Sequence, residues 1–294
     1  MNRHLATLLT PPLLPVLLVQ GYWLRRTTPR LPDAGGPLEG TVAGAGEPLR
    51  LIALGESTVA GVGARTHETG LAGQLASSLS RRSRRSVEWI VVARSGINAR
   101  DSRAELVPQL SGRQADVVMI ALGVNDSIEL HTARRWASDI ERLIEDVRAE
   151  VGDALVLLSG VPPLDYFPAL PQPLSFVLGA RSAALERASV DLVKNLKRVI
   201  YVPFRIERER CDDLFCADGF HPSELGYSEW GPAVGGCLYD PRHELASCWD
   251  RGRPARNERE ARNMDWRNRT LETARLRRVA GETPAVPANH LTGA

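Results

Sequence analysis

Three side chains far apart in the sequence could together perform nucleophilic catalysis. Ser57 lies in a stretch of small residues, Gly55–Gly61, and Asp218 precedes His221 by three residues. A serine hydroxyl is a weak nucleophile, so it needs a base within hydrogen-bond reach, and that base needs a third group to fix its tautomer. His221 can serve as this base, and Asp218 can fold back onto the imidazole nitrogen that faces away from Ser57.

Two further segments carry candidate donors for an oxyanion. Gly96 lies in the stretch Arg94–Asn98, and Asn125 lies in the stretch Gly123–Asp126. Preorganised donors aimed at a developing oxyanion each accelerate acyl transfer on the order of 100- to 1000-fold. The backbone amides of Ser57 and Gly96 and the side chain of Asn125 are the candidates for this role.

Each of these residues also has a simpler interpretation. Ser57 and Asn125 could cap helices, and His221 could be an ordinary histidine in a surface turn. Asp218 could serve only to order its turn. Asp126, next to Asn125, is interpreted as a residue that caps or braces its loop rather than one that reacts.

The elements that would position these residues follow an alternating pattern. Short apolar runs rich in branched residues, typical of buried parallel strands, occupy Leu51–Leu54, Val87–Ala93, Val117–Leu122, Ala154–Leu158 and Val199–Val202. Apolar residues at helical spacing lie between them, in the segments Leu71–Leu79, Trp136–Val147 and Leu185–Leu196. This pattern predicts an α/β fold, a three-layer α/β/α sandwich with a five-stranded parallel, flavodoxin-like sheet. Ligands of such sheets bind outside the carboxyl ends of the strands, where the candidate residues fall.

These residues resemble the sequence blocks of the SGNH, or GDSL-type, hydrolase family, over roughly Leu49 to Trp230. The resemblance implies that Ser57 is the nucleophile and that Asp218 and His221 complete the triad. It also implies that the Ser57 amide, Gly96 and Asn125 form the oxyanion hole. One departure is Glu56, which stands where the family usually has aspartate. That position is outside the triad, so the longer side chain affects the expected loop geometry more than the chemistry.

The segment Val161–Leu174 follows the fourth predicted strand and contains Tyr166 and Phe167. The Gly-Val-Pro-Pro run at 160–163 and the Phe-Pro-Ala-Leu-Pro-Gln-Pro-Leu stretch at 167–174 resemble the bacterial esterase and lysophospholipase-like branch of the family. We therefore interpret Tyr166 and Phe167 as substrate-binding residues in the wall of an acyl-chain site, the alternative being ordinary loop packing. Lysophospholipids and short-chain esters are the expected substrates.

Composition and motifs argue against several other classes. Among the 294 residues, 37 Lys and Arg stand against 35 Asp and Glu, a net charge of +2, which does not favour nucleic-acid binding. The glycines of Gly55–Gly63 match neither a P-loop nor a dinucleotide-binding turn. The spacing of Cys211, Cys216, Cys237 and Cys248 fits no zinc pattern, and a Cys211–Cys216 disulfide or free thiols both remain open. No metal and no cofactor is expected.

The two ends of the chain differ from its centre. We divide the chain into an N-terminal hydrophobic segment with a Pro/Gly linker (1–48), a hydrolase domain (49–235) and an Arg-rich, disordered tail (236–294), with Gly231-Pro232 and Gly235-Gly236 breaking the last helix. Residues 5–24 are mostly apolar but contain three prolines, which predicts a kinked anchor or an interfacial segment and hence membrane association. Arginines after this segment favour the cytoplasmic face, and a periplasmic or secreted location is the alternative.

The function predicted from these features is a metal-independent serine esterase that hydrolyses acyl esters through an acyl-enzyme on Ser57. Three alternatives stay open. The same residues could serve an acyltransferase or a thioesterase, and the chain could instead be a catalytically inactive, membrane-tethered binding module. The oligomeric state does not follow from the sequence.

Overall fold

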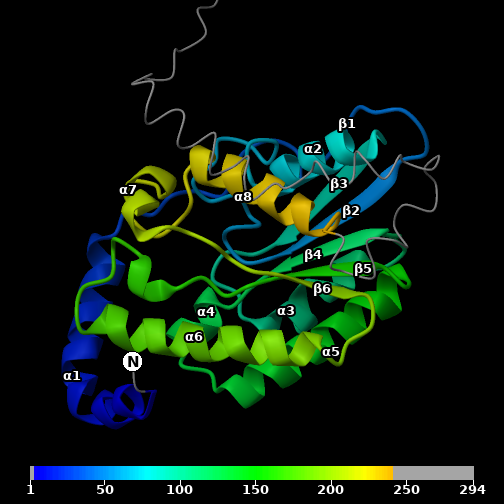
Figure 1. Ribbon diagram of the computed structural model, residues 1–294. Coiled ribbons are helices and arrows are strands. Elements are labelled where there is room, and N and C mark those ends of the chain that lie inside the picture. The colour runs from blue at the N-terminus through cyan, green and yellow to red at the C-terminus, as the bar shows by residue number, and fades with distance from the viewer. Residues whose placement is uncertain (1–2, 241–294) are drawn as a thin grey trace, which may run out of the picture. The chain divides into compact units, whose positions relative to one another are not determined.

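The structure is a computed structural model that describes residues 3–240, with side chains from residue 12 onwards. Nearly all of the predicted tail (236–294) therefore lies outside the described residues, as does Cys248. The central feature is a six-stranded sheet with the order β1-β3-β2-β4-β5-β6 (Figure 1). The strands are β1 (Glu39–Val42), β2 (Leu49–Gly55), β3 (Val87–Ala93), β4 (Val117–Ala121), β5 (Leu155–Ser159) and β6 (Val199–Val202).

Five of these strands are parallel and correspond to the five predicted apolar runs. Their order, β3-β2-β4-β5-β6, is the flavodoxin-like order, in which the first strand of the set lies between the second and the third. The α/β/α sandwich is therefore confirmed. The carboxyl ends of β2, β4 and β5 meet at one edge of the sheet, where a site is expected.

Helices cover both faces of the sheet (Figure 1). On one face, Ile52 and Leu54 of β2 pack into a core with Trp136 and Leu143. The alternate residues of β2 face the opposite side, where α2 packs on the sheet and α8 packs on α2. The helices are α1 (Arg3–Thr27), α2 (Leu71–Ser83), α3 (Ala99–Glu105), α4 (Val124–Ile128), α5 (Ala133–Val151), α6 (Leu174–Val193), α7 (Cys211–Leu214) and α8 (Glu224–Cys237), with 3-10 turns at Val107–Leu110, Leu164–Tyr166 and Arg208–Arg210.

The sixth strand, β1, is a correction to the predicted five-stranded sheet. It lies inside the segment that the composition predicts to be a linker, and it pairs antiparallel with β3, from Glu39 opposite Ile90 to Val42 opposite Val87. Its four residues, EGTV, are too short and too polar to give a strand pattern of their own. The open edge of β3 supplies the hydrogen bonds that hold this segment extended.

The last helix is a second correction, because α8 continues from Glu224 to Cys237 through Pro232 instead of breaking there. The glycines in this helix allow a close approach to α2. A Cβ added at Gly231 would lie 2.5 Å from the Cβ of Gln74 and 2.8 Å from the backbone N of Leu75. A proline inside a helix costs about 3 kcal/mol, and we infer that the packing of α8 on α2 offsets this loss.

The N-terminal apolar segment forms α1, a single helix that includes all three of its prolines. Within residues 3–240, none of the helices combines the length and the apolar character that crossing a bilayer requires.

The packing of α8 on α2 can be tested with two glycines of the same helix. Gly231→Ala should destabilise the protein by about 1–3 kcal/mol, because the new methyl group meets backbone atoms of α2 that cannot move aside. Gly236→Ala is the matched control, since the nearest atom to its added Cβ is the end of the Arg82 side chain at 3.5 Å. Urea unfolding would measure both. Equal free energies of unfolding for the two variants would contradict the proposed contact.

Candidate active site

The structure brings Ser57, His221 and Asp218 into one line of hydrogen bonds. The Nε2 atom of His221 lies 3.0 Å from the Oγ of Ser57. The Nδ1 atom of the same imidazole lies 2.7 Å from the Oδ2 of Asp218. With Asp218 ionised, the imidazole carries its proton on Nδ1 and presents Nε2 as an acceptor to the serine hydroxyl. These contacts have the geometry that a nucleophile, a base and an orienting carboxylate require.

The Asp218 carboxylate both orders its turn and contacts the imidazole. Its Oδ1 accepts hydrogen bonds from the backbone N–H groups of Phe220 (2.9 Å) and His221 (3.0 Å), while its Oδ2 faces the ring. Burial raises the pKa of Asp218, but the bonds from the imidazole and from the two backbone groups lower it by more. The pKa of this carboxyl therefore lies below its ordinary value, and the group is ionised at neutral pH.

Ser57 and His221 are 164 positions apart, and their loops meet through close backbone packing. Gly63, at the end of the Ser57 loop, has a φ of +95°, and a Cβ there would lie 2.2 Å from the carbonyl oxygen of Pro222. The buried Tyr227 of α8 donates from its hydroxyl to the carbonyl of Val62 at 2.7 Å. The Glu224 carboxylate pairs with Arg65, at 3.0 Å, on the same side. The start of α8 thus holds the Ser57 loop against the His221 loop.

Glu56, the residue before Ser57, is a buried carboxyl group that binds the start of α4. Its Oε1 accepts from the backbone N–H of Val124 at 3.0 Å, and its Oε2 accepts from the backbone N–H of Asn125 at 3.1 Å and from the Asn125 side-chain amide. Burial raises the pKa of Glu56 to about 8, although the backbone bonds from Val124 and Asn125 lower it, and the nearby Asp126 raises it further. The carboxyl group at this position therefore lies in direct contact with the candidate oxyanion donor Asn125.

The two predicted oxyanion donors occupy different settings. The Asn125 amide group donates to Glu56 and, at 3.1 Å, to the carbonyl of Ile97, so both of its protons have partners. Gly96 lies in an exposed turn after β3 with a φ of +82°. Neither residue lines the cavity that contains Ser57. Their role as oxyanion donors stays a prediction.

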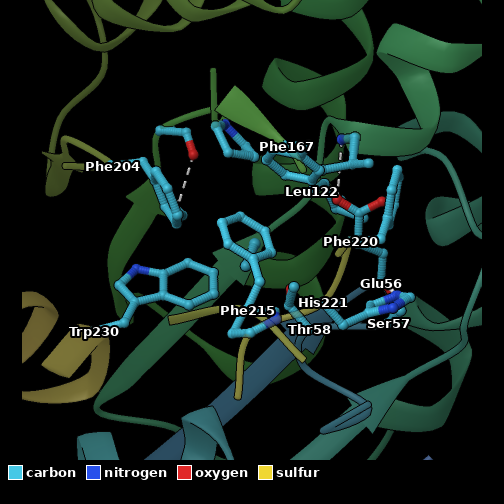
Figure 2. Close-up of a pocket in the computed structure, with 16 residues that line it drawn as sticks. Glu56, Ser57, Thr58, Leu122, Phe167, Phe204, Phe215, Phe220, His221 and Trp230 are labelled. Carbon is cyan, nitrogen blue, oxygen red and sulfur yellow. Dashed lines mark hydrogen bonds between the residues drawn. The ribbon is translucent and has the colours of Figure 1, made fainter. Parts of the chain in front are cut away.

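An apolar cavity extends from Ser57 and His221 along the carboxyl ends of β4 and β5. The space in it that the centre of a water molecule can occupy is about 30 Å³. Figure 2 shows Trp230 and Phe204 on the opposite side of the cavity from Ser57. Phe215 lies between this pair and Ser57. The rings of Phe204 and Trp230 meet edge to face, with centroids 5.1 Å apart. Such a lining suits the apolar part of a ligand.

The structure separates the two predicted substrate-binding residues. Phe167 lines the cavity and packs against Phe215, with ring centroids 4.8 Å apart. Tyr166 does not line it, and its ring lies instead beneath the guanidinium group of Arg208, 4.9 Å away. Sequence reasoning missed Phe204, Phe215 and Trp230. Phe220 also lines the cavity, and its place next to His221 in the sequence is the only sequence feature that indicates this for an aromatic residue outside the segment Val161–Leu174.

The remaining titratable groups near the site have structural partners. Asp126 is fully buried and accepts from the backbone N–H of Ala99 at 3.1 Å, and it also contacts the Nδ1 of His131 at 2.9 Å. It therefore braces its loop, as the sequence indicates.

Cys211 and Cys216 are free thiols with no disulfide between them. Within residues 3–240, no group of three or more His, Cys, Asp or Glu side chains could hold a metal ion.

The chain is similar to several known proteins. Residues 53–228 match the model of the GDSL-like lipase/acylhydrolase family. A GDSL-like esterase, Rv1075c, of Mycobacterium tuberculosis is 28% identical over 240 residues, which cover 72% of each chain.

Two solved structures share the fold. The lipase Lip_vut3 from a goat rumen metagenome has a TM-score of 0.52 at 20% identity, covering 66% of this chain and 100% of the lipase. A carbohydrate esterase family 2 enzyme from Corynascus thermopiles (Myceliophthora fergusii) has a TM-score of 0.51 at 18% identity, covering 67% of this chain and 68% of that enzyme.

The raised pKa of Glu56 predicts a pH dependence of stability. Because the folded-state value of about 8 lies above the ordinary 4.5, the folded state binds this proton more tightly. The stabilisation is complete below pH 4.5 and is lost as the pH rises through about 8. Glu56→Gln should remove this loss, which has a slope of up to about 1.4 kcal/mol per pH unit. Urea unfolding at a series of pH values would measure it.

The matched control is Glu186→Gln, since burial also raises the pKa of Glu186, in this case to about 7. Glu186→Gln should reduce the dependence of the free energy of unfolding on pH only up to about pH 7, the pKa of Glu186. If wild type and Glu56→Gln lose stability in parallel up to and beyond pH 8, the assignment to Glu56 is wrong.

Proposed function

Because the chain belongs to the GDSL-like lipase/acylhydrolase family and is a carboxylic ester hydrolase, we propose that it cleaves esters through an acyl-enzyme on Ser57. The observation that carries this proposal is the unbroken line of contacts from Ser57 through His221 to Asp218. No step of the proposed reaction needs a metal ion or a cofactor.

In the proposed mechanism, the Oγ of Ser57 attacks the ester carbonyl carbon while Nε2 of His221 accepts the hydroxyl proton. The carbonyl oxygen becomes an oxyanion, and the Asp218 carboxylate stabilises the imidazolium that forms. His221 then donates the proton to the departing alcohol, which leaves the acyl group on Ser57. A water molecule, activated by the same imidazole, releases the acid and restores the serine hydroxyl.

We assign the oxyanion to the backbone amide of Ser57 and, after a rearrangement, to the side chain of Asn125. The Asn125 amide must exchange one of its bonds, to Glu56 or to the Ile97 carbonyl, for the oxyanion. A neutral carboxyl group is a weaker acceptor than a carboxylate. With a pKa of about 8, Glu56 is largely neutral at pH 7, which eases this exchange.

The proposed substrate is an ester whose acyl group is apolar and lies against the aromatic side chains of the cavity. The support is the lining by Phe167, Phe204 and Trp230, which offers no charged partner to a polar acyl group. Short-chain esters and lysophospholipids both meet this requirement. A panel of p-nitrophenyl esters, lysophospholipid and acetylated sugar would separate these classes, because only the acetylated sugar places its polar part next to a small acyl group.

The assignment of Ser57 can be tested directly. Ser57→Ala should abolish hydrolysis of a short p-nitrophenyl ester and should prevent labelling by a fluorophosphonate, because the attacking oxygen is gone. Ser228→Ala, which removes an exposed hydroxyl on α8, is the control and should behave like the wild type. Mass spectrometry of the labelled wild-type protein should find the adduct on Ser57. Retained turnover in a correctly folded Ser57→Ala variant would refute the acyl-enzyme.

The cavity predicts how acyl chain length is selected. Phe204→Ala should lengthen the cavity and raise kcat/KM for octanoyl relative to acetyl esters by about tenfold or more. Phe176→Ala is the control, because Phe176 packs in an apolar cluster next to the cavity without lining it. Steady-state kinetics on p-nitrophenyl esters of increasing chain length would measure the ratio. An unchanged ratio in Phe204→Ala would place the acyl group elsewhere.

A further inference from the structure

The helix α1 is attached to the rest of the chain by a narrow inner face. Leu17 is buried in an apolar cluster, and Leu13 and Leu24 pack against the same cluster. Gln20 lies on this face too. Its Nε2 donates to the carbonyl of Gln172 at 2.6 Å, and its Oε1 accepts from the backbone N–H of Leu174 at 3.2 Å. The amide of Gln20 therefore points toward the protein.

The opposite face of α1 is apolar and exposed. Leu18, Val19, Tyr22 and Trp23 have exposed fractions of 64%, 68%, 61% and 57%. In an ordinary surface helix the apolar side chains face the core and the polar ones face water. From residue 12 to residue 24 the only polar side chain apart from the Tyr22 hydroxyl and the Trp23 indole N–H is that of Gln20, and it faces inward. Both faces of α1 are therefore apolar, and the outer face lacks the polar side chains that a helix facing water carries.

Charge at the end of α1 indicates which partner this face suits. Arg25 and Arg26 are exposed in the last turn, and Arg30 follows shortly after the helix. No Asp or Glu occurs before Asp33. The guanidinium group of Arg26 lies 4.9 Å from the ring of Tyr22, which places positive charge next to the apolar face. Apolar side chains flanked by Tyr, Trp and Arg match a lipid surface whose headgroups carry phosphate.

The same cluster that holds α1 also reaches the candidate active site. Leu17 belongs to an apolar cluster that includes Phe167 and Phe215, and both of these side chains line the cavity beside Ser57. Continuous apolar packing therefore connects the inner face of α1 with the wall of the cavity.

We propose that the outer face of α1, formed by Leu18, Val19, Tyr22 and Trp23, binds the surface of an anionic phospholipid bilayer, with Arg25 and Arg26 contacting the lipid phosphates. The helix lies in the interface and does not cross the membrane, because its inner face stays packed on the protein. This inference goes beyond the proposed function and does not depend on catalysis.

The test is sedimentation of the full-length chain with vesicles made of equal parts phosphatidylcholine and phosphatidylglycerol, compared with vesicles of phosphatidylcholine alone. The wild type should bind the anionic vesicles, and added salt should weaken the binding. Replacing Leu18, Val19 and Trp23 together by Gln should weaken binding at least about tenfold, because less apolar area leaves water. Arg25→Gln and Arg26→Gln should each weaken it about fivefold.

Two control variants show whether vesicle binding belongs to α1 alone. Leu225→Gln changes an exposed leucine on α8 and should bind vesicles like the wild type. Ser57→Ala should also bind normally, so that a failed catalytic assignment leaves the result unaffected. Circular dichroism would show that the triple variant is folded.

Two outcomes would overturn the proposal. One is the absence of binding of the wild type to anionic vesicles at low salt. The other is equal binding by the wild type and the triple variant. If the wild type forms a dimer that the triple variant does not form, and neither binds vesicles, then a second copy of the chain covers this face instead.

Discussion

The packing of the Ser57 loop against the His221 loop is the contact on which the candidate active site depends. The close approach at Gly63 and the hydrogen bond from Tyr227 to Val62 bring the two backbones together. Only then does the imidazole reach the hydroxyl, at 3.0 Å. The position of α8, which carries Tyr227, is in turn determined by its close packing on α2.

Two carboxyl groups next to this contact show how the surroundings determine the charge of a residue. Asp218 accepts three hydrogen bonds, one of them from an imidazole, and its pKa is lowered despite burial. Glu56 also accepts three hydrogen bonds but is more deeply buried and lies near Asp126, and its pKa is raised. The proposed mechanism needs this difference, because a charged Asp218 stabilises the imidazolium while a neutral Glu56 releases Asn125 more readily.

The apolar side chains are arranged differently in the helices α5 and α1. In α5, Trp136, Ile140 and Leu143 form a buried stripe, and the Trp136 indole N–H donates to Ser189 at 2.9 Å. This helix is amphipathic in the ordinary sense, with its apolar stripe in the core. In α1 both faces are apolar, because Leu17 is buried against the protein while Leu18, Val19, Tyr22 and Trp23 are exposed. The proposed contact with lipid gives these exposed side chains an apolar environment.

The sequence by itself determined the five parallel strands, the main helices, and the nature and order of the candidate triad. These features are visible because buried parallel strands are continuous apolar runs and because Asp218 and His221 are close in the chain. The tertiary structure decided the rest. The short strand β1 exists because β3 offers an open edge, and α8 continues through Pro232 while Gly231 permits close contact with α2. Phe204 and Trp230 reach the cavity, and Glu56 binds Asn125, only because distant segments fold together. No local pattern records such contacts, since they depend on which strand ends and loops become neighbours in space.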